Sequence, residues 1–181
     1  PVPRGRLLGG SSSINGMVFV RGQPLDYDTW GQLGNRGWSF DDVLPFFQKM
    51  EHYEHGEDDL RSQGGPLRVS KATDEGPLYD AITAASKELG IPHNPDYNGK
   101  SQEGIVRTQT TISNGVRMST ARCYLNPVKN RPNLRIETNA HVQKLLFEGK
   151  KCSGVHFRKN GQDRFVPVSY THLRAHETSR N

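Results

Sequence analysis

The chain has 181 residues, a length that suits one domain or part of a larger one. Its 24 lysines and arginines against 19 acidic residues give a formal charge of +5, without a long basic run interleaved with aromatics, so a nucleic-acid surface is not indicated. The hydrophobic content of 33% and the mean hydropathy of −0.76 are low for a self-contained core, and no stretch approaches the length of a membrane span.

The chain opens on a loop rich in glycine and serine. Residues 4–15 read Arg-Gly-Arg-Leu-Leu-Gly-Gly-Ser-Ser-Ser-Ile-Asn and run into a short apolar element at 14–20. Glycines let a backbone come close to a ligand, and serine hydroxyls with free backbone N–H groups can hold a phosphate or a cofactor edge. By composition alone, however, a flexible loop or linker is the better explanation of such a run.

Two helices are predicted next. The first covers 25–33. The second covers 40–50: Ser39 is a good N-cap for it, and Asp41 and Asp42 fall in its first turn, where the helix dipole favours negative charge. Apolar side chains then recur at helical spacing, which predicts an apolar face on this second helix.

The following segment, 52–66, is polar, charged and rich in glycine, which predicts a mobile loop or a lid. Residues 51–55 contain two histidines and two glutamates. His52 and His55 have the i,i+3 spacing at which a helix can bind a metal, but a solvated helix end that enters a loop is the simpler interpretation. A short strand is predicted at 67–69.

The middle of the chain alternates between helix and strand. An amphipathic helix is predicted at 77–89, closed by Gly90. A strand at 105–111 and a hairpin turn at Asn114-Gly115 follow, and then a helix capped by Ser119 that runs to 128.

The C-terminal part predicts a β-meander. Its strands are expected at 134–138, 142–147 and 153–158, and a further strand begins at 165–167. The fold class is therefore α/β, with mixed α and β elements and a C-terminal meander.

Other reactive side chains have ordinary explanations. Cys123 and Cys152 lie far apart without CxxC spacing, which predicts free thiols in a reducing compartment. Residues 11–13 are serines, but they lie in no GxSxG elbow and have no assignable base, so a serine nucleophile is not indicated. Arg117 and Arg122 flank a helix start, where capping or ion pairing is expected rather than substrate binding.

Both ends of the chain look cut. It starts at Pro1 inside a loop, and residues 168–181 have no hydrophobic periodicity and resemble the translation of a sequencing adapter. We therefore expect the domain to be 1–167 and the tail to be an artefact. His172 and His176 in the tail are spaced i,i+4, but no third ligand is nearby, so no metal site is predicted there.

The segment 5–17, continuing through Val20-Arg21-Gly22, closely resembles the first signature of the glucose–methanol–choline (GMC) oxidoreductases, which are FAD-dependent alcohol-oxidising flavoenzymes. The resemblance covers 1–167 and is strongest to choline dehydrogenase-like members. Later landmarks follow in the family's order: 26–30, Gly37-Trp38, 43–47, 115–125, 131–134 and 140–142 leading to Gly154-Val155.

The resemblance implies part of an FAD/NAD(P)-binding Rossmann-like domain of GMC type. The GxGxxG fingerprint that such a domain needs after its first strand is absent, so the first βαβ unit is missing. The family's catalytic histidine and its second His/Asn lie near its C-terminus, and no residue here matches them. We therefore nominate no catalytic base, and we expect the chain alone neither to turn over substrate nor to hold FAD tightly.

The resemblance also implies where FAD binds. The loop Leu7–Ser11 should run beside the pyrophosphate and ribityl chain, Asn15–Val18 should lie along the isoalloxazine ring with Asn15 near its N5/C4a edge, and Val142 should meet the adenine through its backbone. Some members bond FAD covalently through a histidine where this chain has Ile14, so a non-covalent flavin is expected. The expected cofactor-binding residues are Leu7, Gly9, Gly10, Ser11, Asn15, Gly16, Met17, Val18 and Val142.

The function implied is oxidation of a primary alcohol, choline-like or other, to an aldehyde by hydride transfer to flavin N5. The partners would be a small alcohol and an electron acceptor other than nicotinamide, in the cytoplasm or at the periphery of the inner membrane. Two alternatives stay open. One is a non-enzymatic α/β ligand-binding module whose Gly/Ser loop cradles a phosphate; the other is a related oxidase or lyase on the same scaffold.

Overall fold

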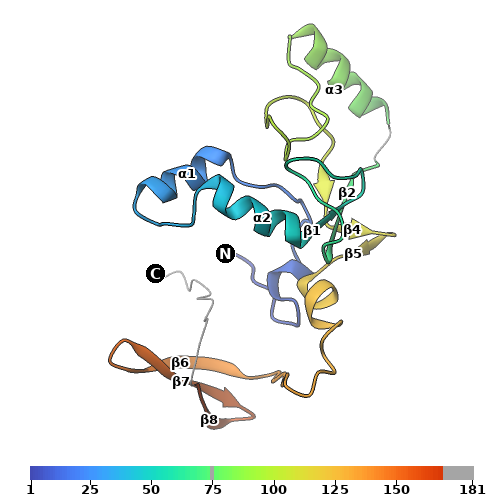
Figure 1. Ribbon diagram of the computed structural model, residues 1–181. Helices are drawn as coiled ribbons and strands as arrows, with labels where there is room; N and C mark the ends of the chain where they lie inside the picture. Colours follow the sequence, from blue (N-terminus) through green and yellow to red (C-terminus); the bar gives the residue numbers. More distant parts are fainter. Residues whose placement is uncertain (74–75, 169–181) are drawn as a thin grey trace. The chain divides into compact units, whose positions relative to one another are not determined.

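The computed structural model describes residues 1–73 and 76–168, which fall into two units (Figure 1). Unit 1 is Pro1–Asn130, and unit 2 begins at Arg131. Apart from Val168, the expected artefactual tail and its two histidines lie outside the described residues, so that expectation stays a prediction.

The helices and strands of unit 1 are, in order, η1 (Gly10–Ser13), α1 (Pro24–Gln32), α2 (Phe40–Met50), β1 (Glu51–Tyr53), β2 (Leu67–Lys71), α3 (Pro77–Glu88), β3 (Gln109–Thr110), β4 (Ile112–Ser113), β5 (Val116–Arg117) and η2 (Ala121–Leu125).

Helices α1 and α2 form where the sequence predicts them. The N-cap of α2 is Ser39, which accepts from the Asp42 backbone N–H while the Asp42 carboxylate accepts from the Ser39 N–H, a capping box. The two helices pack through aromatic side chains: the ring of Tyr27 in α1 lies 6.2 Å from that of Phe40 and 5.7 Å from that of Phe47 in α2.

The segment after α2 corrects two predictions. Residues 51–53 form strand β1, parallel to β2, instead of a solvated helix end. The loop that follows is anchored and not free: Arg61 at its centre is 1% exposed, and the Tyr53 N–H donates to the Ser62 carbonyl at 2.9 Å. The polar composition misled the sequence interpretation, because Arg61 of this loop is buried in ion pairs with Glu51 and Asp96, which lie outside it.

The apolar core of unit 1 is small. Phe19, Tyr53 and Val69 are its buried members, and Met50 and Leu67 pack against them. Strand β2 pairs parallel with β1 and antiparallel with β3, so Val69 sits at the centre of a three-stranded sheet. Such a small apolar cluster leaves much of the cohesion to polar contacts.

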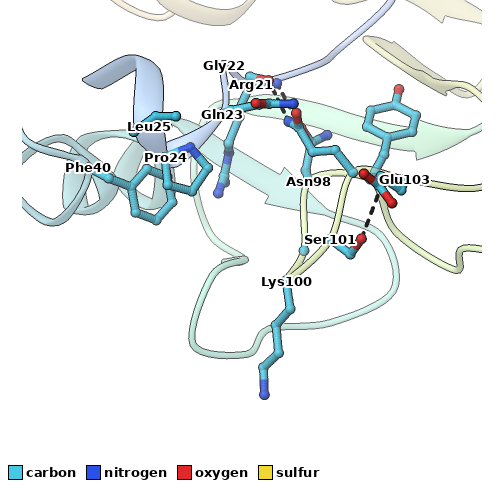
Figure 2. A pocket seen from close by; sticks show the side chains of 13 residues that line it. Arg21, Gly22, Gln23, Pro24, Leu25, Phe40, Asn98, Lys100, Ser101 and Glu103 are labelled. Carbon is cyan, nitrogen blue, oxygen red and sulfur yellow. Dashed lines mark hydrogen bonds between the residues drawn. The ribbon is translucent and has the colours of Figure 1, made fainter. Parts of the chain in front are cut away.

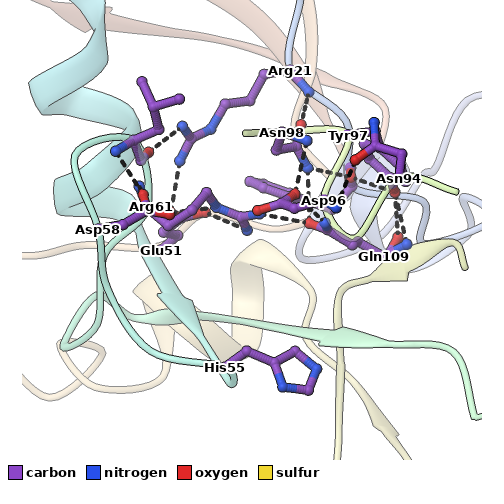
Figure 3. A network of polar contacts seen from close by, with 12 residues as sticks. Arg21, Glu51, His55, Asp58, Arg61, Asn94, Asp96, Tyr97, Asn98 and Gln109 are labelled. Carbon is purple, nitrogen blue, oxygen red and sulfur yellow. Dashed lines mark hydrogen bonds and ion pairs between the residues drawn. The ribbon is translucent and has the colours of Figure 1, made fainter. Parts of the chain in front are cut away.

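A buried network of charges supplies those contacts (Figure 3). The Arg61 guanidinium donates to both carboxylate oxygens of Glu51 at 3.1 Å each, and its Nη1 donates to the Asp96 carboxylate at 2.7 and 2.8 Å. Arg21 forms a second ion pair with Glu51 at 2.7 Å. The Gln109 amide oxygen accepts from Arg61 at 3.0 Å. Two arginines thus balance two carboxylates inside the unit.

The electrostatics of this network favour charged arginines beside a neutral phenol. Burial opposes the charge on Arg61, but the hydrogen bonds and charges of Glu51 and Asp96 outweigh it and raise the pKa of Arg61. Burial, with a contribution from Asp96, raises the pKa of Tyr53 to about 12. The Arg61 guanidinium carbon lies 3.7 Å from the centre of the Tyr53 ring, a cation–π contact.

The raised pKa of Tyr53 predicts an alkaline weakness. The unfolded chain ionises this phenol near its ordinary value of 10.0, whereas the folded chain keeps it neutral until about 12. Unfolding therefore releases a proton in that window, and the free energy of unfolding should fall there by roughly 1–3 kcal/mol. Thermal unfolding across that pH range checks this, and Tyr53→Phe should remove this part of the loss; an unchanged slope in Tyr53→Phe would contradict it.

The middle of the chain agrees with the sequence in its main elements. Helix α3 lies within the predicted 77–89. The Asn114-Gly115 turn joins β4 to β5 with φ angles of 50° and 70°, as a tight hairpin requires. The predicted strand 105–111 shrinks to β3, and the predicted helix 119–128 contracts to the π-helical turn η2.

Unit 2 is the predicted meander. Strands β6 (His141–Glu148), β7 (Lys151–Lys159) and β8 (Gln162–Pro167) pair antiparallel in that order, shown in orange to red in Figure 1. The predicted strand 134–138 is wrong, because that segment forms no strand. Within it, Glu137 pairs with Lys159 at 2.5 Å and with Arg135, and these contacts hold the pKa of its carboxyl below the ordinary value.

Candidate functional site

The glycine–serine loop folds into a tight turn. The Gly10 N–H donates to the Leu7 carbonyl at 2.9 Å, and η1 follows directly. Gly9 and Gly10 have φ angles of 91° and 54°, the left-handed region that glycine enters without a steric cost. At the end of η1, the Ser11 carbonyl accepts from the N–H groups of Ile14 and Asn15 at 3.1 and 2.9 Å. The segment is therefore an ordered turn and not a flexible linker.

The glycines of this loop have different surroundings. A Cβ at Gly5 would collide with the backbone of Gly10 and Ser11, and one at Gly9 would collide with the Ser13 hydroxyl and contact Ala121. At Gly10 and Gly16, in contrast, no atom lies within 4 Å of the Cβ position. The first pair is needed for the internal packing of the loop, whereas the second pair borders open space that a ligand can occupy.

Hydroxyl groups tie the loop to the start of η2. Ser12 Oγ donates to the Gly9 carbonyl at 2.5 Å and accepts from the Thr120 N–H at 2.9 Å. Thr120 Oγ1 donates to the same Gly9 carbonyl at 3.1 Å. Ser13 Oγ donates to the Leu8 carbonyl at 3.0 Å. The serines thus hold the turn in shape, which the sequence could not distinguish from a ligand-binding role.

Residues 16–19, after the turn, form a segment that we call the strap, which is hydrogen-bonded to residues 109–111. The Met17 carbonyl accepts from the Thr111 N–H at 2.8 Å, and the Phe19 N–H donates to the Gln109 carbonyl at 2.9 Å. Met17 has a φ of 62°, an uncommon conformation for a side chain other than glycine. Such local strain persists only where the surroundings impose it, and it is frequent at ligand sites.

Apolar side chains around the loop are uncovered. The exposed fractions are 55% for Leu7, 48% for Ile14 and 58% for Val18. Because several apolar side chains of the loop and strap are exposed, this segment suits contact with an apolar group. The strap and the loop therefore offer a face that combines open backbone at Gly10 and Gly16 with apolar contact.

The structure brings most of the predicted site residues together. Leu7 to Val18 lie in this one loop and strap, whereas Val142 lies in unit 2, on the edge strand β6. Val142 is 54% exposed, and the outer edge of β6 carries no partner strand among residues 1–73 and 76–168. Sequence reasoning missed Ser12 and Thr120 as supports of the loop.

Arg117 also supports the loop, a role that the sequence did not predict. Its Nη1 donates to the backbone carbonyls of Asn15 at 2.7 Å and Ser12 at 3.3 Å, and to the side-chain oxygen of Asn15 at 2.8 Å. The expected capping of the next helix or ion pairing is therefore not what this arginine does: its acceptors are oxygens of the predicted cofactor loop. The only sequence signal for this was its place directly after the hairpin turn.

A separate hollow of about 340 Å³ lies between the start of α1 and the loop 97–103 (Figure 2). Its wall includes Arg21, Gln23, Phe40 and Asn98, and the Lys100 side chain extends away from the others. The Asn98 side-chain oxygen accepts from the Arg21 N–H at 2.8 Å, so one wall belongs to the buried network. None of the predicted cofactor-binding residues lines this hollow.

Within residues 1–73 and 76–168, no group of three or more His, Cys, Asp or Glu side chains is placed to hold a metal ion, and no helix is long and apolar enough to cross a membrane. Cys123 is a buried free thiol, and burial raises its pKa. Cys152 is also a free thiol.

Known proteins resemble this chain in both sequence and structure. The family profile described as GMC oxidoreductase matches residues 1–177. The oxygen-dependent choline dehydrogenase of Brucella ovis is 45% identical over 153 residues, which cover 84% of this chain and 28% of that protein. The corresponding protein of Sinorhizobium fredii is 43% identical over 167 residues, 92% of this chain and 30% of that protein.

Solved structures agree. The crystal structure of pyridoxine 4-oxidase from Mesorbium loti aligns with a TM-score of 0.84 at 34% identity, over 91% of this chain and 33% of that one. An FAD-dependent oxidoreductase from Chaetomium thermophilum also has a TM-score of 0.84, at 30% identity over 93% of this chain and 32% of that one. The chain thus spans about a third or less of the length of these relatives. The predicted α/β fold class and the family resemblance are confirmed.

Proposed function

Because this chain belongs to the GMC oxidoreductase family, we propose that it is part of a longer FAD-dependent enzyme and forms one side of its flavin site. The observation that carries the proposal is the contrast among the loop glycines. Gly5 and Gly9 are packed against protein, whereas Gly10 and Gly16 border open space beside exposed apolar side chains. A loop that is internally fixed but open on one face is suited to hold a flat, partly apolar cofactor.

The residues present fit FAD, which is the cofactor of this family. Leu7–Ser11 would approach the pyrophosphate and ribityl chain, and Asn15–Val18, with Gly16 and Met17, would lie along the ring. The backbone of Val142 on the free edge of β6 would meet the adenine. Ile14 carries no nucleophile, so we expect the flavin to be bound non-covalently; a flavin peptide that survives denaturation would contradict this.

When bound, FAD supplies the hydride acceptor. The activity we propose is oxidation of a CH–OH group, with a primary alcohol converted to an aldehyde. A choline-like alcohol is the leading substrate, because proteins named oxygen-dependent choline dehydrogenase are 45% identical to this chain. The neighbour named pyridoxine 4-oxidase, 34% identical, keeps oxidase activity as the second candidate. The non-enzymatic binding module is not favoured, since the family profile that matches this chain is that of an oxidoreductase and its relatives are named as dehydrogenases and oxidoreductases.

The chain's own part in that reaction is to bind FAD and to hold it in a fixed orientation. The loop carbonyls that face inward are held by Ser12, Thr120 and Arg117, which leaves the outer N–H groups rigid. No residue here corresponds to the family's catalytic histidine pair, so the general base is expected elsewhere in the longer protein. The electron acceptor of the whole enzyme would be other than nicotinamide. The enzyme would lie in the cytoplasm or at the periphery of the inner membrane.

The site assignment is tested by flavin content. In the full-length protein, Gly10→Val places a branched side chain at a φ of 54° and in the open space, and should weaken FAD binding by about tenfold or more. Asn15→Ala removes the predicted polar contact to the ring and should lower bound flavin in the same assay. Visible flavin absorbance of the purified protein measures both; full flavin content in both variants would refute the assignment.

A genomic observation gives an independent test. The coding sequence upstream of Pro1 should contain a β-strand followed by GxGxxG, because the resemblance requires that fingerprint for the missing half of the cradle. Its absence would favour the binding module instead.

A further inference from the structure

We propose that Arg117 is a positioning residue of the flavin site, which fixes the Asn15 side-chain amide so that its NH₂ group is presented to the cofactor as a hydrogen-bond donor. This inference rests on the proposed function, because it assumes that Asn15 faces FAD. It goes further by naming which atom of Asn15 faces the ring and which residue holds it there.

The contacts of the amide oxygen carry the argument. Asn15 Oδ1 accepts from Arg117 Nη1 at 2.8 Å and from the Met17 backbone N–H at 3.2 Å. Both neighbours are donors only, so neither could pair with the NH₂ group if the amide were turned round. Two donors on one atom therefore decide the orientation of an amide whose two ends are otherwise hard to tell apart.

The other end of the amide is left for a ligand. Asn15 Nδ2 donates to no group within residues 1–73 and 76–168, and the Asn15 side chain lies on the exposed side of the loop. Its neighbour Gly16 borders open space. The unused donor thus lies beside the region where the proposed function places the isoalloxazine ring.

Arg117 is itself held firmly enough to act as a support. It lies on β5, and the next residue, Met118, donates through its N–H to the Thr111 carbonyl at 2.9 Å. Thr111 in turn donates to the Met17 carbonyl at 2.8 Å. The hairpin and the strap are therefore one hydrogen-bonded unit, and the arginine spans them. Among the described residues, no carboxylate lies within ion-pair distance of Arg117, so its cationic donors are directed at the loop oxygens.

The chemical consequence concerns the redox state of the ring. A fixed donor binds a ring oxygen more strongly as that oxygen gains electron density, and the ring oxygens gain density when the flavin is reduced. N5 takes up the hydride and becomes an N–H donor, so the acceptor for the Asn15 NH₂ group would be a ring oxygen and not N5. Arg117 should therefore favour the reduced flavin over the oxidised one, through Asn15.

The experiment uses the full-length holoprotein and compares FAD dissociation constants in the oxidised and reduced states, together with the flavin absorption maximum. Arg117→Met should weaken binding of reduced FAD by about tenfold, the loss of roughly one charge-assisted hydrogen bond, and should shift the absorption maximum. Arg117→Lys should recover part of the loss. Arg122→Met, an exposed arginine of the same segment, is the matched control and should leave both readouts unchanged.

Two further variants separate positioning from a general structural effect. Asn15→Asp keeps the shape and a partner for Arg117 but removes the donor, so it should lose the preference for reduced FAD as Asn15→Ala does. Combined with Asn15→Ala, Arg117→Met should add less than about twofold, because its effect passes through Asn15. The comparison of Asn15→Asp with Asn15→Ala holds even if Arg117→Met lowers the melting temperature, because both single variants retain Arg117.

The outcomes are distinct. If Arg117→Met has the same effect in the Asn15→Ala background, or if Asn15→Asp retains the preference for reduced FAD, the positioning role is overturned while the flavin site stands. If neither Asn15→Ala nor Gly10→Val alters FAD binding, the proposed flavin site fails, and this inference fails with it.

Discussion

Arg61→Met should lower the free energy of unfolding by about 3–5 kcal/mol, the cost of leaving a buried charge without its partner. The Glu51 and Arg61 side chains are 0% and 1% exposed, so water cannot replace the lost contacts. Arg21, Arg61, Glu51 and Asp96 carry two positive and two negative charges in one cluster. Removal of Arg61 leaves one negative charge in excess, and Asp96 then has no cation. Chemical denaturation of the full-length protein measures the loss.

The charge argument has its own control. Arg61→Met combined with Asp96→Asn restores the balance of charges and should recover roughly half of the lost stability. Arg68→Met on β2 changes the same residue type at an exposed position and should cost less than about 0.5 kcal/mol. If the double variant is no more stable than Arg61→Met, the cost arises from lost packing around the Tyr53 ring and not from unpaired charge.

This network shows where sequence patterns stop being informative. Periodicity predicts α2 and α3, and the cap of α2 forms between Ser39 and Asp42, which are close in the chain. Arg61 makes its contacts with residues 10, 35 and 48 positions away, so a polar segment around it reads as a loop. No local rule distinguishes a charge that is paired in the interior from one that is solvated.

The strand predicted at 134–138 failed for a related reason. Leu134 and Ile136 alternate with polar residues, as strand residues do, but both remain exposed, at 36% and 38%. Alternation predicts a strand only where the segment pairs with a partner strand, and residues 134–138 pair with none in the described part of the chain. The turns at Gly149 and Gly161 were predictable because their φ angles of 60° and 77° favour glycine.

The candidate site was predictable in outline only. The order of residues 5–17 identified the family, and the structure places Leu7 to Val18 in one loop. The supports of that loop were not predictable, since Thr120 and Arg117 lie 108 and 102 positions from Ser12 and Asn15. A resemblance carries over motif residues, whereas the side chains that hold a motif in place are found only from distances.

The second large effect is expected at Gly5, which the resemblance includes in the signature but does not place against the cofactor. Gly5→Ala puts a Cβ onto the Gly10 carbonyl group and 2.8 Å from the Ser11 nitrogen. These are backbone atoms, which cannot rotate away as a side chain can, so the turn must open. The Gly5 N–H also donates to Ser11 Oγ at 3.2 Å, and this contact would be lost. We expect FAD affinity to fall about 10- to 100-fold, because one overpacked position typically costs about 1–3 kcal/mol and each 1.4 kcal/mol is a tenfold change in affinity.

Flavin titration of the full-length protein measures this change, with thermal unfolding recorded alongside. Gly31→Ala in α1 is the matched control: its added methyl group meets Ser39 at an ordinary 3.6 Å and should leave FAD binding unchanged. A loss confined to FAD binding indicates that Gly5 shapes the turn, because the network around Arg61 would remain intact. Unchanged FAD affinity in Gly5→Ala would mean that the close approach of Gly5 to Gly10 is not required, and the internal packing of the loop could then not explain its fixed shape.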